Sequence, residues 1–129
     1  MKAQSLTINS HVSDYLNTTS IFGEVKKTII SKDFKGGKIN NLFGETILDF
    51  TYADLSGVVV LDIAQGFGEI NITVPANWRV ETDITNFFAV TKDRRNDVTR
   101  LKNSDKILVI TGNSAFAEVN IIESTYGDY

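Results

Sequence analysis

The chain has no cysteine, one histidine and one proline among its 129 residues. The lack of cysteine excludes disulfide bonds, thiolate zinc sites and a cysteine nucleophile. The single histidine, His11, has no second ligand at metal-binding spacing, no G-x-S-x-G motif accompanies it, and we interpret it as a surface residue. The sequence therefore predicts no catalytic residue, no metal site and no cofactor.

Long apolar runs and a strong charge of one sign are also missing. The longest apolar run, residues 58–63, is interrupted by Asp62 and is far shorter than the roughly 20 residues that span a bilayer. The first 16 residues lack the apolar segment of a secretion signal. A net charge of −3 and a pI near 5.1 give no reason to expect nucleic acid or anionic lipid as a partner. We expect a chain that is soluble as written and contains no membrane span.

What the chain does contain is strand-like sequence along most of its length. Alternating stretches rich in Val, Ile, Thr and Phe are separated by glycines and Asn/Asp/Ser clusters. They are "EVKKTII", "KINNLF", "ETILDFTY", "GVVVLDIA", "EINITV", "WRVETDI", "KILVITG" and "AEVNII". The polar stretch 93–106 is typical of a solvated loop, with a short amphipathic helix as the alternative.

This pattern predicts an all-β protein with one domain. We assign residues 1–20 to an N-terminal segment or cap, 21–123 to the domain, and 124–129 to a polar C-terminal tail.

A phenylalanine followed by Gly or Ala recurs along the chain. The phenylalanines are 21, 24, 21 and 28 residues apart, and they are Phe22, Phe43, Phe67, Phe88 and Phe116. A dinucleotide-binding glycine loop would occur once and would precede a helix, so "GFGEINITV" is not interpreted as one. Instead, the small residue lets the backbone bend or approach a neighbour closely beside the bulky ring.

A repeat of this length built from short strands predicts a β-solenoid, similar to a right-handed β-helix, of about five short coils. Successive coils would stack with equivalent strands in parallel, about 4.8 Å apart. Ile70, Ile72 and Val74 would fill the interior, and Lys27 at a matching position indicates a more polar capping coil. A β-sandwich is the alternative, because regular short strands suit it as well.

Four copies of the repeat carry a glutamate at the same position. Stacked coils would bring these carboxylates to about 5 Å from one another, where like charges repel. The residues are Glu24, Glu45, Glu69 and Glu118. Three arrangements would relieve the repulsion: a bound cation such as calcium, lysines such as Lys26 or Lys38, or exposure to water, which we favour.

Two longer phrases carry a family resemblance. "FKGGKINNLFGETILDFTYADLSG" and "GFGEINITVPANWRVETD", with the recurring Phe-Gly, resemble the soluble C-terminal domain of LiaF-type cell-wall-stress response proteins. The resemblance runs from about Ile21 to Arg95 and more weakly to Ile122. Its most specific parts are Gly36-Gly37, Ala53-Asp54 and the stretch from Val74-Pro75 to Trp78-Arg79-Val80.

The resemblance implies a bacterial, β-solenoid-like "toastrack" domain without catalytic activity. In the family this domain is attached to membrane helices and restrains a sensor histidine kinase that responds to envelope damage. We therefore expect a non-enzymatic signalling regulator whose partner is a protein, such as a sensor histidine kinase or a membrane protein. Unpaired strand edges also suit a homo-oligomer. The location would be cytoplasmic, or membrane-associated through a missing or partner membrane segment.

The loop "KDRRND" is our candidate for partner contact. Its residues Asp93, Arg94 and Arg95 include two guanidinium groups, which bind carboxylates as planar forks, on an otherwise acidic chain.

The alternative function is a carbohydrate-binding or carbohydrate-active β-solenoid. Such a site needs converging carboxylates, for which Asp49, Asp62 and Asp83 are candidates, together with aromatic platforms. Trp78 could be such a platform, although we interpret it as closing the core.

Overall fold

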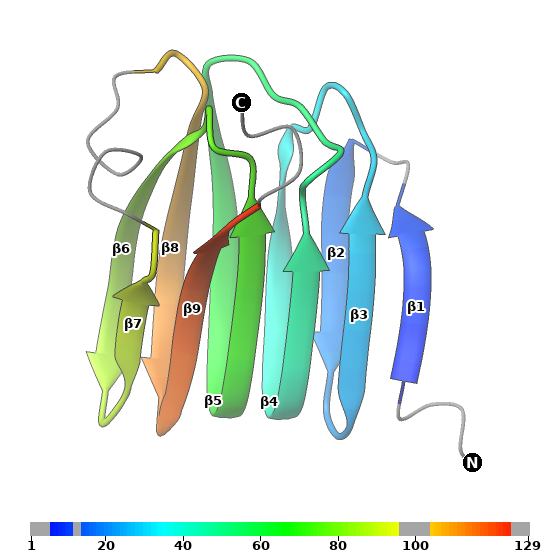
Figure 1. Cartoon of the computed structure of the whole chain (residues 1–129). Helices are drawn as coiled ribbons and strands as arrows, with labels where there is room; N and C mark the ends of the chain where they lie inside the picture. The colour runs from blue at the N-terminus through cyan, green and yellow to red at the C-terminus, as the bar shows by residue number, and fades with distance from the viewer. Residues whose placement is uncertain (1–5, 12–13, 96–103, 125–129) are drawn as a thin grey trace.

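The structure is a computed structural model, which describes residues 6–11, 14–95 and 104–124 (Figure 1). All the regular elements among these residues are strands, and no helix occurs. The strands are β1 (Leu6–His11), β2 (Tyr15–Ser20), β3 (Glu24–Ile29), β4 (Gly36–Asp49), β5 (Val58–Val74), β6 (Arg79–Phe87), β7 (Val90–Asp93), β8 (Ile107–Ala115) and β9 (Ala117–Glu123). The prediction of an all-β protein is confirmed.

The strands form one nine-stranded sheet in which the pairs of described strands are all parallel. The long strands β4 and β5 each take part in two rows of pairing. Their first halves lie in the order β2, β4, β5, β8, β6, which we call the rear layer, and their second halves in the order β1, β3, β4, β5, β9, β7, the front layer. Figure 1 shows the two layers one behind the other, with the chain turning between them at the lower edge.

The order of the strands corrects one expectation. The repeats do not all stack in chain order, because β8 and β9 lie between β5 and the pair β6 and β7. The unit formed by β8 and β9 has aliphatic, fully buried inward residues, namely Leu108, Ile110, Val119 and Ile121. The inward positions of β6 and β7 include Thr82, which is exposed, and Asp93. The more apolar pair, β8 and β9, therefore lies inside the sheet, and the more polar pair, β6 and β7, lies at its end.

One hydrophobic core lies between the two layers. It collects side chains from both layers and from the upper connections: Leu16, Ile29, Phe34, Ile39, Leu48, Phe50, Ala53, Leu55, Val59, Leu61, Ile63, Ile70, Ile72, Val74, Trp78, Val80, Leu108, Ile110, Val119 and Ile121. Across the front layer one inward row aligns Lys27, Leu48, Ile72, Ile121 and Asp93 in register. The charged residues Lys27 and Asp93 flank the apolar centre of this row, and Asn9 of β1 lies beyond Lys27 in register. The end strand of this layer is therefore β1, and the capping place predicted for the unit that contains Lys27 is corrected.

Residues from the predicted N-terminal cap contribute two strands to the sheet. β1 pairs with β3, and β2 pairs with β4. The side chain of His11 lies outside the described residues, as do most of the stretch 93–106 and most of the predicted tail. Ser124, the first residue of that tail, is buried and its amide donates to the carbonyl of Val74 at 2.8 Å.

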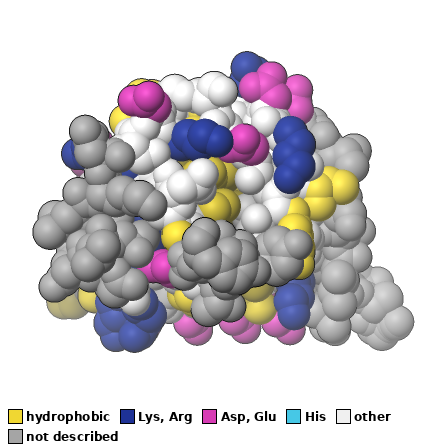
Figure 2. Space-filling view, turned by 45° about the horizontal axis from the view of Figure 1, so that its top comes forward, with side chains coloured by type: hydrophobic (Ala, Val, Ile, Leu, Met, Phe, Trp, Pro, Cys, Tyr) yellow, Lys and Arg dark blue, Asp and Glu magenta, His cyan; other side chains and the backbone are white. Residues whose placement is uncertain are grey.

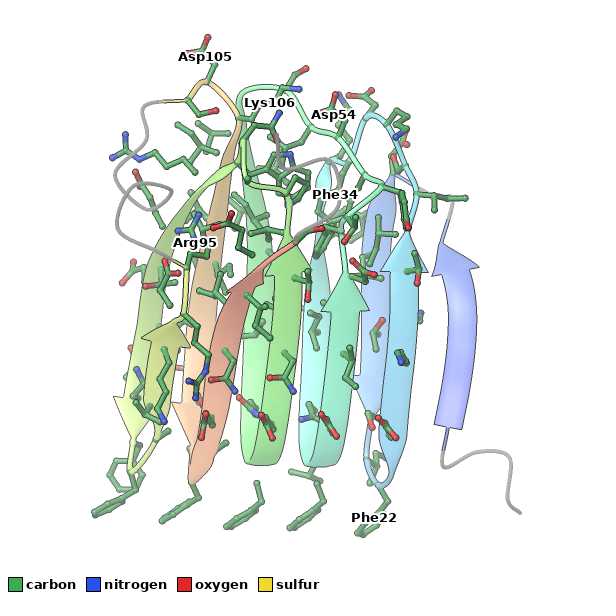
Figure 3. The ribbon with its side chains drawn as sticks, viewed as in Figure 1. Phe22, Phe34, Asp54, Arg95, Asp105 and Lys106 are labelled. Atoms are coloured by element: carbon green, nitrogen blue, oxygen red, sulfur yellow. The ribbon has the colours of Figure 1, made fainter. Side chains whose placement is uncertain are left out.

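At the upper edge of the sheet, aromatic side chains from the connections close the core (Figure 3). Phe34 packs edge-on against Phe50 with ring centroids 5.0 Å apart, and Trp78 lies 5.6 Å from Phe50. Trp78 is only 1% exposed. It closes the core as predicted and offers no surface for a stacked ligand.

Charged side chains of both signs spread over this upper edge (Figure 2). Lys106 donates to Asp54 at 2.6 Å and ties the β4–β5 connection to the start of β8. This hydrogen bond holds the pKa of Asp54 below its ordinary value. The pair is partly exposed, so we assign it little weight in stability.

Thr46 offers a test of the core. It lies in an inward row between Val25 and Ile70, is fully buried, and its hydroxyl has no hydrogen-bond partner in the described part of the chain. Thr46→Val should raise the free energy of unfolding by about 1 kcal/mol, because it removes an unpaired buried hydroxyl and keeps the shape. Urea denaturation measures this.

The matched control is Thr111→Val. The Thr111 hydroxyl donates to the carboxylate of Asp62 at 2.9 Å, so its loss should cost about 1 kcal/mol. A Thr46→Val variant that is no more stable than the parent would contradict the assignment of Thr46.

Candidate interaction surface

The five repeated phenylalanines form one stacked ladder along the lower edge of the sheet (Figure 3). Neighbouring rings are nearly parallel, with interplanar angles of 4° to 14° and centroids 5.1 to 5.5 Å apart. The order along this Phe ladder is Phe22, Phe43, Phe67, Phe116, Phe88. The prediction that these residues occupy equivalent positions is confirmed, whereas their order follows the sheet and not the chain.

The turn beside each ring is made in two ways. In the first three copies the glycine after Phe has a positive φ, which reaches 135° at Gly44 and 138° at Gly68. A Cβ on Gly68 would lie 1.9 Å from the carbonyl oxygen of Gly44, so the predicted close approach is present. In the last two copies Ala takes the place of Gly, and the phenylalanine itself has the positive φ, 52° at both Phe88 and Phe116.

The Phe ladder is exposed to solvent. Its inner rings, Phe43, Phe67 and Phe116, are 39% to 49% exposed, and its end rings, Phe22 and Phe88, 74% and 75%. Because each inner ring is covered on both faces by its neighbours, the ring edges point outward. An exposed apolar row of this length is typical of an interaction surface.

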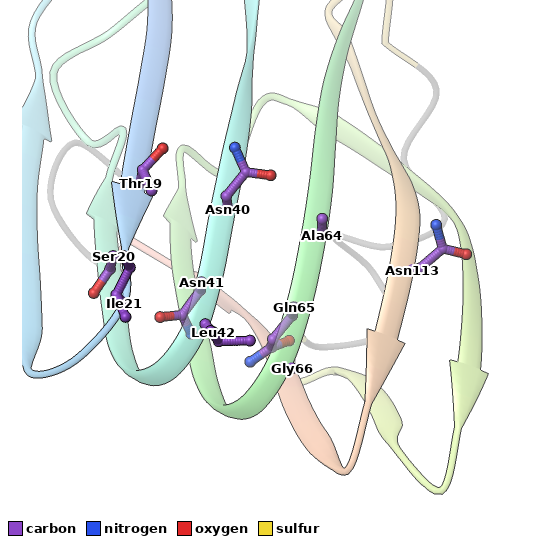
Figure 4. Close-up of a pocket in the computed structure, with 10 residues that line it drawn as sticks. All are labelled: Thr19, Ser20, Ile21, Asn40, Asn41, Leu42, Ala64, Gln65, Gly66 and Asn113. Carbon is purple, nitrogen blue, oxygen red and sulfur yellow. The ribbon is translucent and has the colours of Figure 1, made fainter.

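A shallow groove of about 460 Å³ runs beside the ladder on the rear layer (Figure 4). The exposed side chains of Ile21 and Leu42 border it, and Gly66 and Ala64 leave it hollow because their side chains are absent or small. The groove widens the apolar surface beyond the rings themselves.

The four repeated glutamates are aligned in register across the front layer, next to the Phe ladder. The pairs are Glu24 with Glu45, Glu45 with Glu69, and Glu69 with Glu118. The predicted carboxylate ladder is therefore present. No group of three or more His, Cys, Asp or Glu residues in the described segments could hold a metal ion.

Asparagine side chains relieve part of the repulsion between the glutamate carboxylates. The sequence did not lead us to predict this role for asparagine. Asn71 donates to Glu45 at 2.9 Å, and Asn120 donates to Glu69 at 2.9 Å and to the side-chain oxygen of Asn71 at 3.0 Å. The signal was available, since both asparagines lie two residues after a repeated glutamate in "GEIN" and "AEVN". At the end of the ladder, Lys92 and Arg94 lie 3.7 and 3.4 Å from Glu118.

Asn120 is the centre of this network, and its replacement is a second test. The amide of Asn120, together with the cations Lys92 and Arg94, holds the pKa of Glu118 below the ordinary 4.5. Asn120→Ala should raise that pKa, as measured by carbon NMR titration. Because the folded pKa is depressed, the Glu118 contribution to stability is present above 4.5 and is lost as the pH falls through the folded value.

The same variant should also lose about 1 to 3 kcal/mol of stability at pH 7, because the hydrogen bonds of Asn120 with Glu69, Asn71 and Arg94 are removed. An unchanged Glu118 pKa in Asn120→Ala would show that the amide has no such role. Asn113→Ala, an exposed asparagine in the rear layer, is the matched control and should leave that pKa unchanged.

The residues predicted for partner contact are largely engaged within the chain. The guanidinium of Arg95 donates to both carboxylate oxygens of Asp93, at 2.8 and 2.7 Å, and to the carbonyl of Trp78 at 3.2 Å. Its side chain is 1% exposed. Arg94 donates to Asn120 at 2.9 Å and keeps 52% of its side chain exposed. Lys92, at the start of the loop, lies 3.7 Å from Glu118, and residues 96 and 97 lie outside the described residues.

The acids considered for carbohydrate chemistry do not converge. Asp62 and Asp83 share an outward row of the rear layer, with Thr111 of β8 between them. Asp49 lies in the front layer. The covered ring faces of the Phe ladder also do not provide stacking platforms for sugars, apart from its two ends.

These observations define an all-β repeat domain with an exposed aromatic ladder. The family model described as "Cell wall-active antibiotics response LiaF, C-terminal" matches residues 21–126, and the chain belongs to this family. The resemblance identified in the sequence is thereby confirmed, and it places the chain in the response to cell wall-active antibiotics. No curated protein and no solved structure matches the chain. Within the described residues no helix is long and apolar enough to cross a membrane.

Proposed function

We propose that this chain is a non-catalytic regulatory domain that acts by contact with a partner protein in the cell envelope stress response. In this proposal it restrains a sensor histidine kinase until cell wall damage releases it. The observation that carries the proposal is the exposed Phe ladder on a domain of this family, because a soluble surface keeps so long an apolar row only at some cost in solubility. The domain would be cytoplasmic, or held at the membrane through another segment or its partner.

The proposal includes a solenoid winding for the sheet. Support comes from β4 and β5, each of which passes from the rear layer to the front layer and pairs in parallel with its neighbours in both. An antiparallel sandwich would not produce this pairing. A rigid wound sheet suits an interaction module, since it holds equivalent side chains at a fixed spacing.

Contact through Asp93, Arg94 and Arg95 remains a prediction. Arg94 is the member with an exposed guanidinium, whereas Arg95 is already bound by Asp93. Self-association through strand edges also remains a prediction, because among the described residues no further strand lies outside β1 and β2 at one end of the sheet or β6 and β7 at the other.

The test is a deletion of the coding region in its native host, with a reporter for the kinase-dependent promoter. Deletion should raise reporter output in the absence of antibiotic, and expression of the chain with its natural flanking segments should restore the low baseline. An unchanged baseline after deletion would contradict the restraining role. Pairing the deletion with loss of the kinase controls for indirect stress, because the raised output should then disappear.

A further inference from the structure

We propose that the Phe ladder and the adjoining glutamate ladder together form a docking surface for an amphipathic helix of a partner protein. The helix would carry an apolar stripe and a row of lysines or arginines along one flank. This inference rests on the proposed function and specifies the chemistry of its partner.

The dimensions of the Phe ladder fit one helix. Four gaps of 5.1 to 5.5 Å separate the five centroids, so the ladder is about 20 Å long. A helix of about 14 residues has this length at a rise of 1.5 Å per residue. The outward ring edges leave ridges and furrows between them, into which leucine or methionine side chains can pack. The groove bordered by Ile21 and Leu42 extends this surface on the rear side.

The glutamates beside the Phe ladder favour a partner helix that carries basic residues along one flank. Glu45 and Glu69 accept hydrogen bonds from asparagine amides, which carry no charge to balance theirs. Within the described segments no cation lies within 4.0 Å of Glu24, Glu45 or Glu69. A shallow hollow lined by Glu45, Glu69, Glu118 and Phe116 joins the two ladders. A helix with lysines on the matching flank would meet apolar and acidic rows at once.

Two other occupants suit this surface less well. A second copy docked through the ladder alone would bury a strip of about 20 by 10 Å, well below the roughly 800 Å² per partner of a stable interface. An anionic membrane would be repelled by the glutamate row, since such surfaces attract clusters of Lys and Arg.

The test uses the whole chain and a fluorescein-labelled synthetic helix of 14 residues, with leucines in a stripe and lysines along one flank. Fluorescence anisotropy should show binding that weakens as salt is raised. The pair Glu45→Gln with Glu69→Gln should weaken binding about tenfold, because it removes two charges while keeping oxygen acceptors for the amides. The pair Phe43→Ala with Phe67→Ala should also weaken it, with folding checked by circular dichroism.

The matched control removes the same number of charges elsewhere. Both acids are exposed: Asp83 of β6 lies in the rear layer, opposite the front layer that carries the glutamates, and Asp105 lies on the upper edge, away from the Phe ladder (Figure 3). Asp83→Asn with Asp105→Asn should leave the affinity within about twofold of the parent, because only long-range screened charge is lost.

Several results would overturn the docking surface. One is equal affinity of the parent and the Glu45/Glu69 variant for the basic peptide. A second is that the parent binds a matched peptide, with glutamates in place of lysines, as tightly as the basic peptide. Another is sedimentation of the chain with phosphatidylcholine or phosphatidylglycerol vesicles that requires Phe43 and Phe67, which would indicate a membrane. A dimer by light scattering that Phe43→Ala with Phe67→Ala abolishes would indicate a second copy.

The reporter strain separates this inference from the proposed function. If deletion raises the baseline but the Glu45/Glu69 variant restores it as well as the parent does, the docking surface is wrong and the restraining role stands. If deletion has no effect, the restraining role fails whatever the peptide does.

Discussion

Gly68→Ala is expected to lower the free energy of unfolding by about 3 kcal/mol or more. Gly68 has a φ of 138°, a region that side chains with a Cβ rarely adopt, and its added Cβ would lie 1.9 Å from the carbonyl oxygen of Gly44. That oxygen belongs to the backbone of β4 in the middle of the sheet, so no side-chain rotation relieves the contact. Urea denaturation followed by the fluorescence of the buried Trp78 measures the loss.

Gly57→Ala is the matched control. Gly57 has a φ of 70°, and a Cβ there would meet nothing within 4 Å. Its replacement should cost only about 1 kcal/mol, which is the price of the left-handed conformation without a clash. Equal losses at the two positions would contradict the close approach of β4 and β5 beside the Phe ladder.

Asp93→Ala is expected to cost about 3 kcal/mol, because it leaves the guanidinium of Arg95 buried without its counterion. Both carboxylate oxygens of Asp93 bind that group, and among the described residues the carbonyl of Trp78 is the one further acceptor. Asp93 and Arg95 therefore close the end of the core beside β9. Thermal or urea unfolding measures the effect.

An exposed ion pair provides the comparison. Lys35 and Asp33 lie 3.1 Å apart with about 60% of each side chain exposed, so Asp33→Ala should change stability by less than about 0.5 kcal/mol. Asp93→Leu combined with Arg95→Met should recover most of the stability lost in Asp93→Ala, since apolar residues of similar volume replace a buried pair well. A double variant as unstable as the single one would contradict this account of the pair.

The repeat made much of the interaction surface predictable. Phe and Glu recur at fixed offsets, and parallel pairing keeps equal positions side by side, so both ladders follow from counting residues. The strand content was predictable for the same reason, because the alternation of apolar and polar residues is regular. The burial of Trp78 followed from its size and its place after a turn.

The order of the last two repeats in the sheet, β6 with β7 and β8 with β9, was not predicted. This order depends on which repeat buries more apolar surface. Leu108 and Ile110 occupy inward positions where β6 has Val80 and Thr82, and this contrast was visible in the sequence. The buried state of Arg95 was missed because a charged loop is normally solvated. Only the fold shows that Asp93 and Trp78 enclose this one side chain.

The placement of β9 between β5 and β7 is the central claim about the architecture, and cysteine cross-linking tests it most directly in this cysteine-free chain. Asn71 and Asn120 are register partners, as are Asn120 and Lys92. Adjacent strands bring Cα atoms to about 4.8 Å, within the reach of a disulfide, whereas residues two strands apart lie beyond the roughly 7 Å limit. Mild oxidation should therefore cross-link Asn71→Cys with Asn120→Cys and leave Asn71→Cys with Lys92→Cys reduced. The reverse result would mean that the repeats stack in chain order, and it would contradict the ladder described above.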